Sequence, residues 1–151
     1  MCIKALIYNI FMQKPTEKTK KMLLINTEEE LFNSIIPNNH PFRKLNAIVD
    51  WSEIFAPVAD CYSHTGTVAT DYEKGMKALI IQFWEDYSDR EMEKAIKENM
   101  AVRWFCGFGL TEEMPTYSYF SKLRTRVGTK RIANLFKEVN NVLAQHGLLE
   151  T

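Results

Sequence analysis

The chain has 151 residues, of which 46% are hydrophobic and 25% are charged. A globular domain of this length buries roughly 70% of the surface that its unfolded chain exposes, so it needs neither a disulfide nor a metal ion to fold. The 19 basic and 19 acidic residues cancel at pH 7, which excludes nucleic-acid binding through bulk positive charge. The three cysteines lie far apart in the sequence, as is typical of free thiols in a reducing compartment.

The N-terminal segment predicts neither a membrane anchor nor a secretory signal. Its apolar run from Ile3 to Met12 is interrupted by Lys4 and Asn9 and is too short to span a bilayer. No basic segment precedes this run, and no small-residue cleavage site follows it. We therefore expect a cytoplasmic protein without membrane contact, with residues 1–27 as a flexible lead-in and residues 28–151 as one helical domain.

Helix starts recur along the chain. A Ser or Thr followed three residues later by Glu has the spacing of a capping box, and the pairs are Thr27 with Glu30, Thr70 with Glu73, and Ser88 with Glu91. Thr116, which follows Pro115, can cap a fourth helix through its side-chain oxygen. Glu93 and Lys97 are four residues apart, in the order that favours an ion pair on a helix.

Apolar residues follow these starts at helical intervals. After Thr70 and Ser88 they are Tyr72, Met76, Leu79, Ile80 and Phe83, and then Met92, Ala95, Ile96 and Met100. After Thr129 a long stripe stops at Gly147; its members are Ile132, Leu135, Phe136, Val139, Val142, Leu143 and His146. Sustained alternation of apolar and polar residues is missing. The sequence therefore predicts an all-α fold, a compact bundle of five or six helices, with buried aromatics at Trp51, Phe83, Trp84, Trp104, Phe105, Phe120 and Phe136.

Three patterns in the sequence resemble chemical sites, but each is more typical of a structural role. Gly107-Phe108-Gly109 lacks the third glycine of a phosphate-binding loop and is typical of a helix end followed by a turn. Cys61 and His64 have the spacing of half a metal site, but no second pair completes it. Cys106 and His146 would suit a nucleophile and its base, yet Cys106 follows two aromatics, which indicates a buried thiol, and His146 belongs to the apolar stripe at the core's edge. We expect no catalytic residue, metal or cofactor.

The segment 117–131 stands out by its charge. Residues 122–131 carry five basic side chains and no acidic one, whereas residues 85–98 carry six acidic and three basic ones. On a helix that begins at Tyr117, one arc is apolar and the opposite arc carries hydroxyls and Lys122, with Arg124 and Arg126 at its borders. Hydroxyls and long cations on a helical face reach phosphates and base edges. The candidate DNA-binding residues are Ser118, Ser121, Lys122, Arg124, Thr125, Arg126, Lys130 and Arg131.

The same composition also suits a solvated helix face. A capped helix from Ser88, a glycine-containing connection and a short helix from Tyr117 have a helix-turn-helix-like order, although the connection is longer than the usual three or four residues. If the basic groups instead pair with the acidic residues 85–98, the helix is internal and does not contact DNA.

Three blocks of the sequence carry a family resemblance. They are HPFRKLNAIVDWSEI (40–54), FWEDYSDREMEKAIKENMAVRWFCGFGL (83–110) and MPTYSYFSKLRTRVG (114–128). In this order, and with LAQHGLL (143–149), they resemble the N-terminal domain of InsH-type insertion-sequence transposases. In that family the domain is taken to bind the terminal inverted repeats of the element and to help assemble the transposase. The resemblance implies double-stranded DNA as a partner, together with a second copy or full-length transposase.

The resemblance also implies what this chain does not do. In the family, a following RNase H-like domain carries a DDE carboxylate triad that holds two divalent metals. No aspartate here matches that motif, and two-metal chemistry needs all its carboxylates around one phosphodiester, so we expect no enzymatic activity from this chain by itself. The sequence departs from the family at Tyr87, where Leu is usual, and at Thr116, where Asp is common; the loop 61–71 lacks the Pro and Arg often found there.

A second function stays open. A protein–protein module that oligomerises transposase subunits, with weak or no direct DNA contact, also suits a neutral chain with 12% aromatic residues.

Overall fold

The computed structural model describes residues 27–62 and 72–148, and over these ranges it contains helices and no strand. The chain divides into two compact units, residues 1–31 and 32–151. The helices are α3 (Glu28–Ile35), α4 (Pro41–Ile48), α5 (Trp51–Phe55), the 3-10 helix η1 (Ala56–Tyr62), α6 (Tyr72–Trp84), α7 (Asp89–Glu98), α8 (Met100–Cys106), α9 (Tyr117–Val127) and α10 (Thr129–Gln145). The predicted all-α bundle is confirmed.

The described residues form eight α-helices, more than the five or six expected, because polar caps divide segments that the apolar pattern runs together. Asn99 ends α7 in an extended conformation, and its side chain accepts hydrogen bonds from the N–H groups of Ala101 and Val102 at the start of α8. Between α4 and α5, Val49 ends the first helix in an extended conformation and Asp50 caps the second, where one carboxylate oxygen accepts from the N–H groups of Ser52 and Glu53.

The predicted capping boxes are confirmed where the structure describes them. Glu30 and Thr27 exchange side chain-to-backbone hydrogen bonds, and Ser88 and Glu91 do the same at the start of α7. Thr70 lies outside the described residues. These bonds satisfy backbone N–H groups that the first turn of a helix leaves without a partner.

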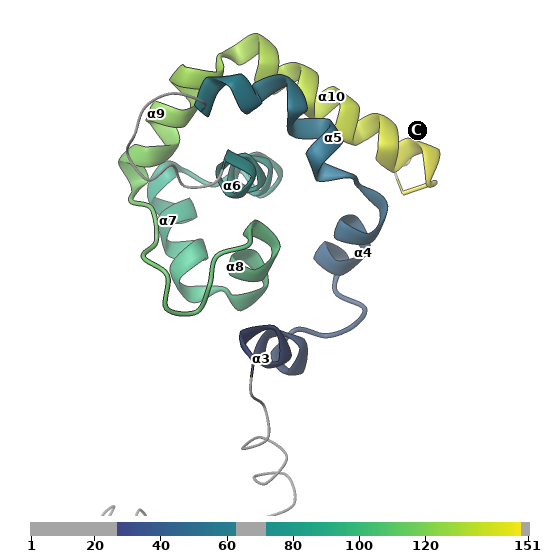
Figure 1. The fold of residues 1–151 in the computed structure, drawn as a ribbon, viewed down its shortest axis with the longest axis vertical. Coiled ribbons are helices and arrows are strands. Elements are labelled where there is room, and N and C mark those ends of the chain that lie inside the picture. Colours follow the sequence, from purple (N-terminus) through teal and green to yellow (C-terminus); the bar gives the residue numbers. More distant parts are fainter. Residues whose placement is uncertain (1–26, 63–71, 149–151) are drawn as a thin grey trace, which may run out of the picture. The chain divides into compact units, whose positions relative to one another are not determined.

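Helix α6 is the centre of the second unit. Figure 1 shows it end-on, with α5 and α10 on one side, α7 and α9 on another, and α8 opposite. Its buried side chains point in nearly every direction, as expected for a helix with neighbours all round; they include Met76, Ala78, Leu79, Ile80, Ile81 and Gln82.

Most of the expected aromatic core is present, with one error. Trp51, Phe105 and Phe120 are buried, and Trp84, Trp104 and Phe136 are half-buried against the core. The prediction for Phe83 is wrong, because 68% of this residue is exposed. Phe83 lies in the last turn of α6, and its ring packs on that of Phe136, with 4.4 Å between the ring centres.

Two helix ends require glycine. Gly107 closes α8 in the left-handed region, with φ of 85°, as expected for a residue that ends a helix. Gly128 joins α9 to α10 with φ of 87° and ψ of 146°, a region that is essentially restricted to glycine. His146 follows α10 and is exposed, so its predicted place at the edge of the core is wrong. Within the described ranges, no helix combines the length and apolarity that crossing a membrane requires.

Candidate nucleic-acid interface

The helix α9 is amphipathic, as its sequence predicts. Phe120, Leu123 and Val127 are buried. The predicted polar arc faces outward, because Ser121, Lys122, Thr125 and Arg126 are exposed, whereas Ser118 is half-buried. The hydroxyl of Thr125 donates to the carbonyl of Ser121 at 3.1 Å, within the helix.

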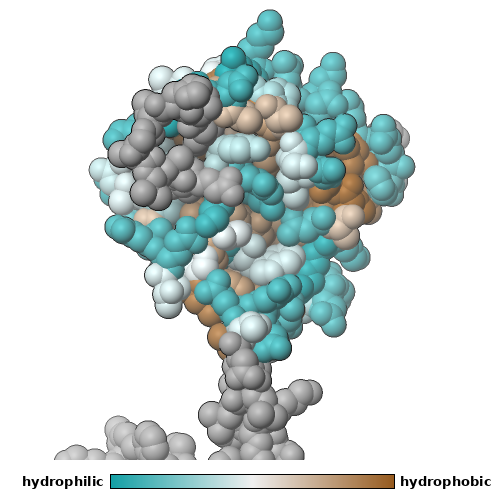
Figure 2. Space-filling model, in the orientation of Figure 1, coloured by the Kyte–Doolittle hydropathy of each residue, from teal (hydrophilic) through white to brown (hydrophobic). Residues whose placement is uncertain are grey.

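The first turn of α10 extends this surface. Lys130 and Arg131 are exposed, and an Nη1 hydrogen of Arg131 points at the Cys61 sulfur. Residues 114–137 contain six basic side chains and no acidic one. We call the following set the basic face: Ser118, Ser121, Lys122, Thr125, Arg126, Lys130 and Arg131. Hydrophilic residues cover most of the molecular face seen in Figure 2.

Arg124, the eighth predicted residue, is placed differently. Its Nη1 and Nη2 atoms each donate to one carboxylate oxygen of Asp89, both at 2.8 Å, and Nη1 also donates to Oε1 of Gln82. Gln82 in turn donates to Asp89. The guanidinium holds the pKa of Asp89 below its ordinary value, and the carboxylate raises the pKa of Arg124. For this one residue, the alternative of pairing with the acidic segment is right.

A second contact between α7 and α9 is not predicted by the sequence. Thr116 occupies the N-cap position of α9, as predicted, but its side chain makes no capping hydrogen bond. Instead, Oε2 of Glu93 accepts from the N–H of Tyr117 at 2.8 Å, while Oε1 binds Lys97 in the predicted ion pair. The hydrogen bonds from Lys97 and then Tyr117 lower the pKa of Glu93.

The model of one protein family matches residues 30–126, which is more than half of the chain, and its description is "Transposase domain (DUF772)". This chain belongs to that transposase family. No solved structure matches the chain. The matched range begins in α3 and ends in α9, so it includes α7 and most of the helix that carries the basic face.

Between α7 and α9, for which the sequence predicts a helix-turn-helix-like order, the structure contains an additional element. Helix α8 lies between α7 and the connection 107–116. That connection is anchored, because Phe108 is buried and the carboxylate of Glu112 binds both Lys74 and the N–H of Gly109. A long but well-bonded connection therefore leads into α9.

The residues weighed as chemical sites occupy structural positions. Cys106 is buried, and this burial raises the pKa of its thiol well above the ordinary range, which keeps it protonated and unreactive. Gly107 ends α8, as predicted. His64 lies outside the described residues. The ring of His146 is exposed at the end of α10, with Nδ1 at 2.9 Å from the carbonyl oxygen of Val142.

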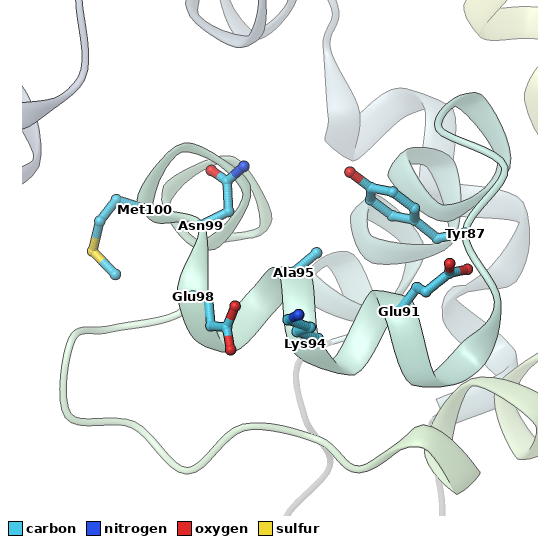
Figure 3. Close-up of a pocket in the computed structure, with 7 residues that line it drawn as sticks. All are labelled: Tyr87, Glu91, Lys94, Ala95, Glu98, Asn99 and Met100. Carbon is cyan, nitrogen blue, oxygen red and sulfur yellow. The ribbon is translucent and has the colours of Figure 1, made fainter.

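A shallow groove of about 500 Å³ follows the outer side of α7. Figure 3 shows that the side chains lining it extend from Tyr87, before α7, along the helix to Met100 at the start of α8, and do not converge on one point. Glu91, one of them, is engaged in the capping box. The basic face therefore remains the candidate functional surface of this transposase domain.

Proposed function

We propose that this transposase domain binds double-stranded DNA at the terminal repeats of an InsH-type insertion sequence and helps assemble the transposase there. One observation carries the proposal. The predicted polar arc of α9 is exposed next to the basic first turn of α10, in a stretch of 24 residues without an acidic side chain. A neutral chain that collects its cations in this way presents the local clustering that DNA binding requires.

The free cations of the basic face support this role. Lys122 and Lys130 are exposed and form no ion pair with any part of the chain that the structure describes. They can therefore bind phosphates without first breaking an internal contact. Ser121 and Thr125 lie next to Lys122 on the exposed arc of α9, where hydroxyls add hydrogen bonds to phosphates or base edges. The helix would enter the major groove, as recognition helices do.

We propose further that these 151 residues do not cleave DNA by themselves and use no metal or cofactor. Five carboxylates in the described ranges have a lowered pKa because of hydrogen bonds within the fold: Asp50, Asp89, Glu91, Glu93 and Glu112. Such carboxylates are already engaged in the fold. Robust Mg²⁺- or Mn²⁺-dependent nicking that disappears on replacing one of the chain's aspartates would contradict this part.

The proposal is tested by fluorescence anisotropy with a duplex that carries the element's terminal repeat and with a scrambled duplex. Four cations of the basic face, Lys122, Arg126, Lys130 and Arg131, would release roughly four counterions, so log K should fall against log salt with a slope of about −3 to −4. The terminal repeat should bind more tightly than the scrambled duplex. A flat salt response, or equal weak binding of both duplexes, would count against the proposal.

A second candidate function is oligomerisation, and an apolar surface at the end of α6, which adjoins Asp89 and Arg124, favours it. Phe83 is exposed beside Phe136, and both line a hollow of about 540 Å³ with Leu79 and Ile132. A second hollow, of about 390 Å³, is mainly apolar; its lining includes Phe42, Leu45, Trp84, Leu143 and Leu148. Exposed aromatic clusters are typical of protein interfaces.

Light scattering coupled to size-exclusion chromatography separates the two functions. An oligomer that dissociates on replacing Phe83→Ser, in a chain without salt-dependent DNA binding, would support the oligomerisation module alone. A matched control is Phe83→Leu, which keeps the apolar surface.

A further inference from the structure

The contacts between α7 and α9 indicate a role for residues that do not touch DNA themselves. Resting on the DNA-binding function proposed above, we propose that Asp89 and Arg124 are a positioning pair: they fix α9 on α7 and thereby set how the basic face meets DNA, while Arg124 does not touch DNA. This separates the eight cationic and hydroxyl positions expected from the sequence into the seven of the basic face, six of them exposed and Ser118 half-buried, and one that orients them.

The geometry of the pair is that of a structural clamp. Arg124 and the Asp89 carboxylate form two parallel hydrogen bonds of 2.8 Å each, the bidentate arrangement that gives an arginine its strongest directional preference. Both hydrogens of Nη1 are engaged, because this atom also donates to Gln82 at 3.1 Å. Gln82 is 8% exposed and belongs to α6. The clamp therefore joins three helices at one point.

Helical geometry shows what the clamp orients. Successive residues are about 100° apart around an α-helix, so fixing the direction of Arg124 fixes every other side chain of α9. Counted from Arg124, the outward residues fall within a sector from about 60° to about 200°. That sector contains Ser118, Ser121, Lys122, Thr125 and Arg126. The buried Phe120, Leu123 and Val127 lie on the other side of Arg124, so the guanidinium sits at the border between the two faces.

A second contact holds the start of the same helix. Glu93 lies one turn after Asp89 on α7 and accepts from the N–H of Tyr117. The guanidinium of Arg90 lies over the Tyr117 ring, at 4.2 Å from its centre. Helix α7 therefore holds α9 at its first residue and again about two turns later, which restricts both tilt and rotation.

The pair also changes the electrostatic role of Arg124. Asp89 already neutralises this guanidinium, so bringing DNA to the basic face displaces no counterion from Arg124. If Arg124 were instead a phosphate ligand held back by Asp89, then removing the carboxylate would free it and strengthen binding. The two roles therefore predict opposite changes in DNA affinity when the Asp89 carboxylate is removed: weaker binding for a positioning pair and tighter binding for a phosphate ligand.

The experiment compares Asp89→Asn and Arg124→Gln with Lys122→Gln, a matched loss of one exposed cation on the same helix, all in the full chain. Affinities for the terminal-repeat and scrambled duplexes are measured over a series of salt concentrations. We expect Asp89→Asn and Arg124→Gln each to weaken terminal-repeat binding by about threefold to tenfold, with the wild-type salt slope retained. Their double variant should lose no more than either one, because both remove the same clamp. Lys122→Gln should weaken both duplexes and make the slope shallower by about one unit.

If Asp89→Asn or Arg124→Gln does not fold, Arg124→Lys still tests the positioning role. It keeps the charge and loses the fork, so a positioning role predicts reduced preference for the terminal repeat at an unchanged slope, whereas a phosphate ligand would keep its affinity. Tighter binding by Asp89→Asn, or a slope that becomes shallower by one unit in Arg124→Gln, would overturn the positioning role and leave the proposed function standing. Wild-type binding that does not respond to salt would overturn both.

Discussion

The carboxylate of Glu93 in α7 accepts the first N–H of α9, from Tyr117, at 2.8 Å and across 24 residues of sequence. The first N–H groups of a helix have no partner within it, and here a side chain of a different helix supplies one. A carboxylate at this position also stabilises the positive end of the helix dipole.

Removing this contact should therefore loosen the start of α9. We expect Glu93→Gln to lower the midpoint of thermal unfolding, because the amide is neutral and a weaker acceptor and because the ion pair with Lys97 is lost. Glu98→Gln is the control, since Glu98 is an exposed acid at the end of the same helix. Equal midpoints for the two variants, measured by circular dichroism, would show that the cap contributes nothing.

A second prediction concerns the close crossing of α6 and α9. A Cβ atom added at Gly75 would overlap the hydroxyl oxygen of Tyr119 and lie 3.0 Å from a methyl carbon of Leu123. Such overpacking typically costs about 1–3 kcal/mol. Gly75→Ala should lower the free energy of unfolding in urea by less than that amount, because alanine favours the helix more than glycine does and offsets part of the cost. In a Tyr119→Phe background the same substitution should cost less, because the overlapping atom is gone; an equal or larger cost would contradict this account of the crossing.

The clamp also makes stability depend on pH. The hydrogen bonds from Arg124 lower the pKa of Asp89 in the folded chain, so folding favours the ionised form. Its contribution is complete above the unfolded-state pKa of about 3.9 and is lost as pH falls through the folded-state value. The difference in unfolding free energy between wild type and Asp89→Asn should therefore be constant from pH 7 to about 5 and shrink below about pH 4. A difference that stays constant down to the acid transition would mean that the pair adds no stability.

The elements that sequence reasoning recovers are those whose cause is local. Ser88 and Glu91 are three residues apart, so the sequence alone predicts their capping box, and the structure contains it. The burial pattern of α9 likewise follows from its own periodicity. Periodicity fails for Phe83, because it shows the direction in which a side chain points and not whether a neighbouring helix extends far enough to cover it.

The candidate site is only partly predictable from the sequence, because some of its contacts join residues that are far apart in the chain. Arg124 and Asp89 are 35 residues apart, and their meeting depends on how α7 packs on α9. On a helical wheel Arg124 stands at the border of the polar arc, where either a solvent-facing or an inward-facing role fits. The acidic segment 85–98 indicates a partner for the basic helix. It does not indicate which cation of that helix forms the ion pair.

The most direct test of the DNA-binding role compares Arg126→Ala with Lys130→Ala. Arg126 is exposed beside the hydroxyls of α9, whereas Lys130 begins α10. If α9 reads base edges, Arg126→Ala should cost about 1–3 kcal/mol on the terminal repeat and reduce its preference over the scrambled duplex.

Lys130→Ala should weaken both duplexes by the same factor and make the slope of log K against log salt shallower by about one unit. The measurement is the affinity ratio of the two duplexes for wild type and both variants at several salt concentrations. A DNA-reading α9 predicts a smaller ratio for Arg126→Ala and an unchanged ratio for Lys130→Ala. Wild-type affinities and slopes in both variants would contradict it and would favour the oligomerisation module.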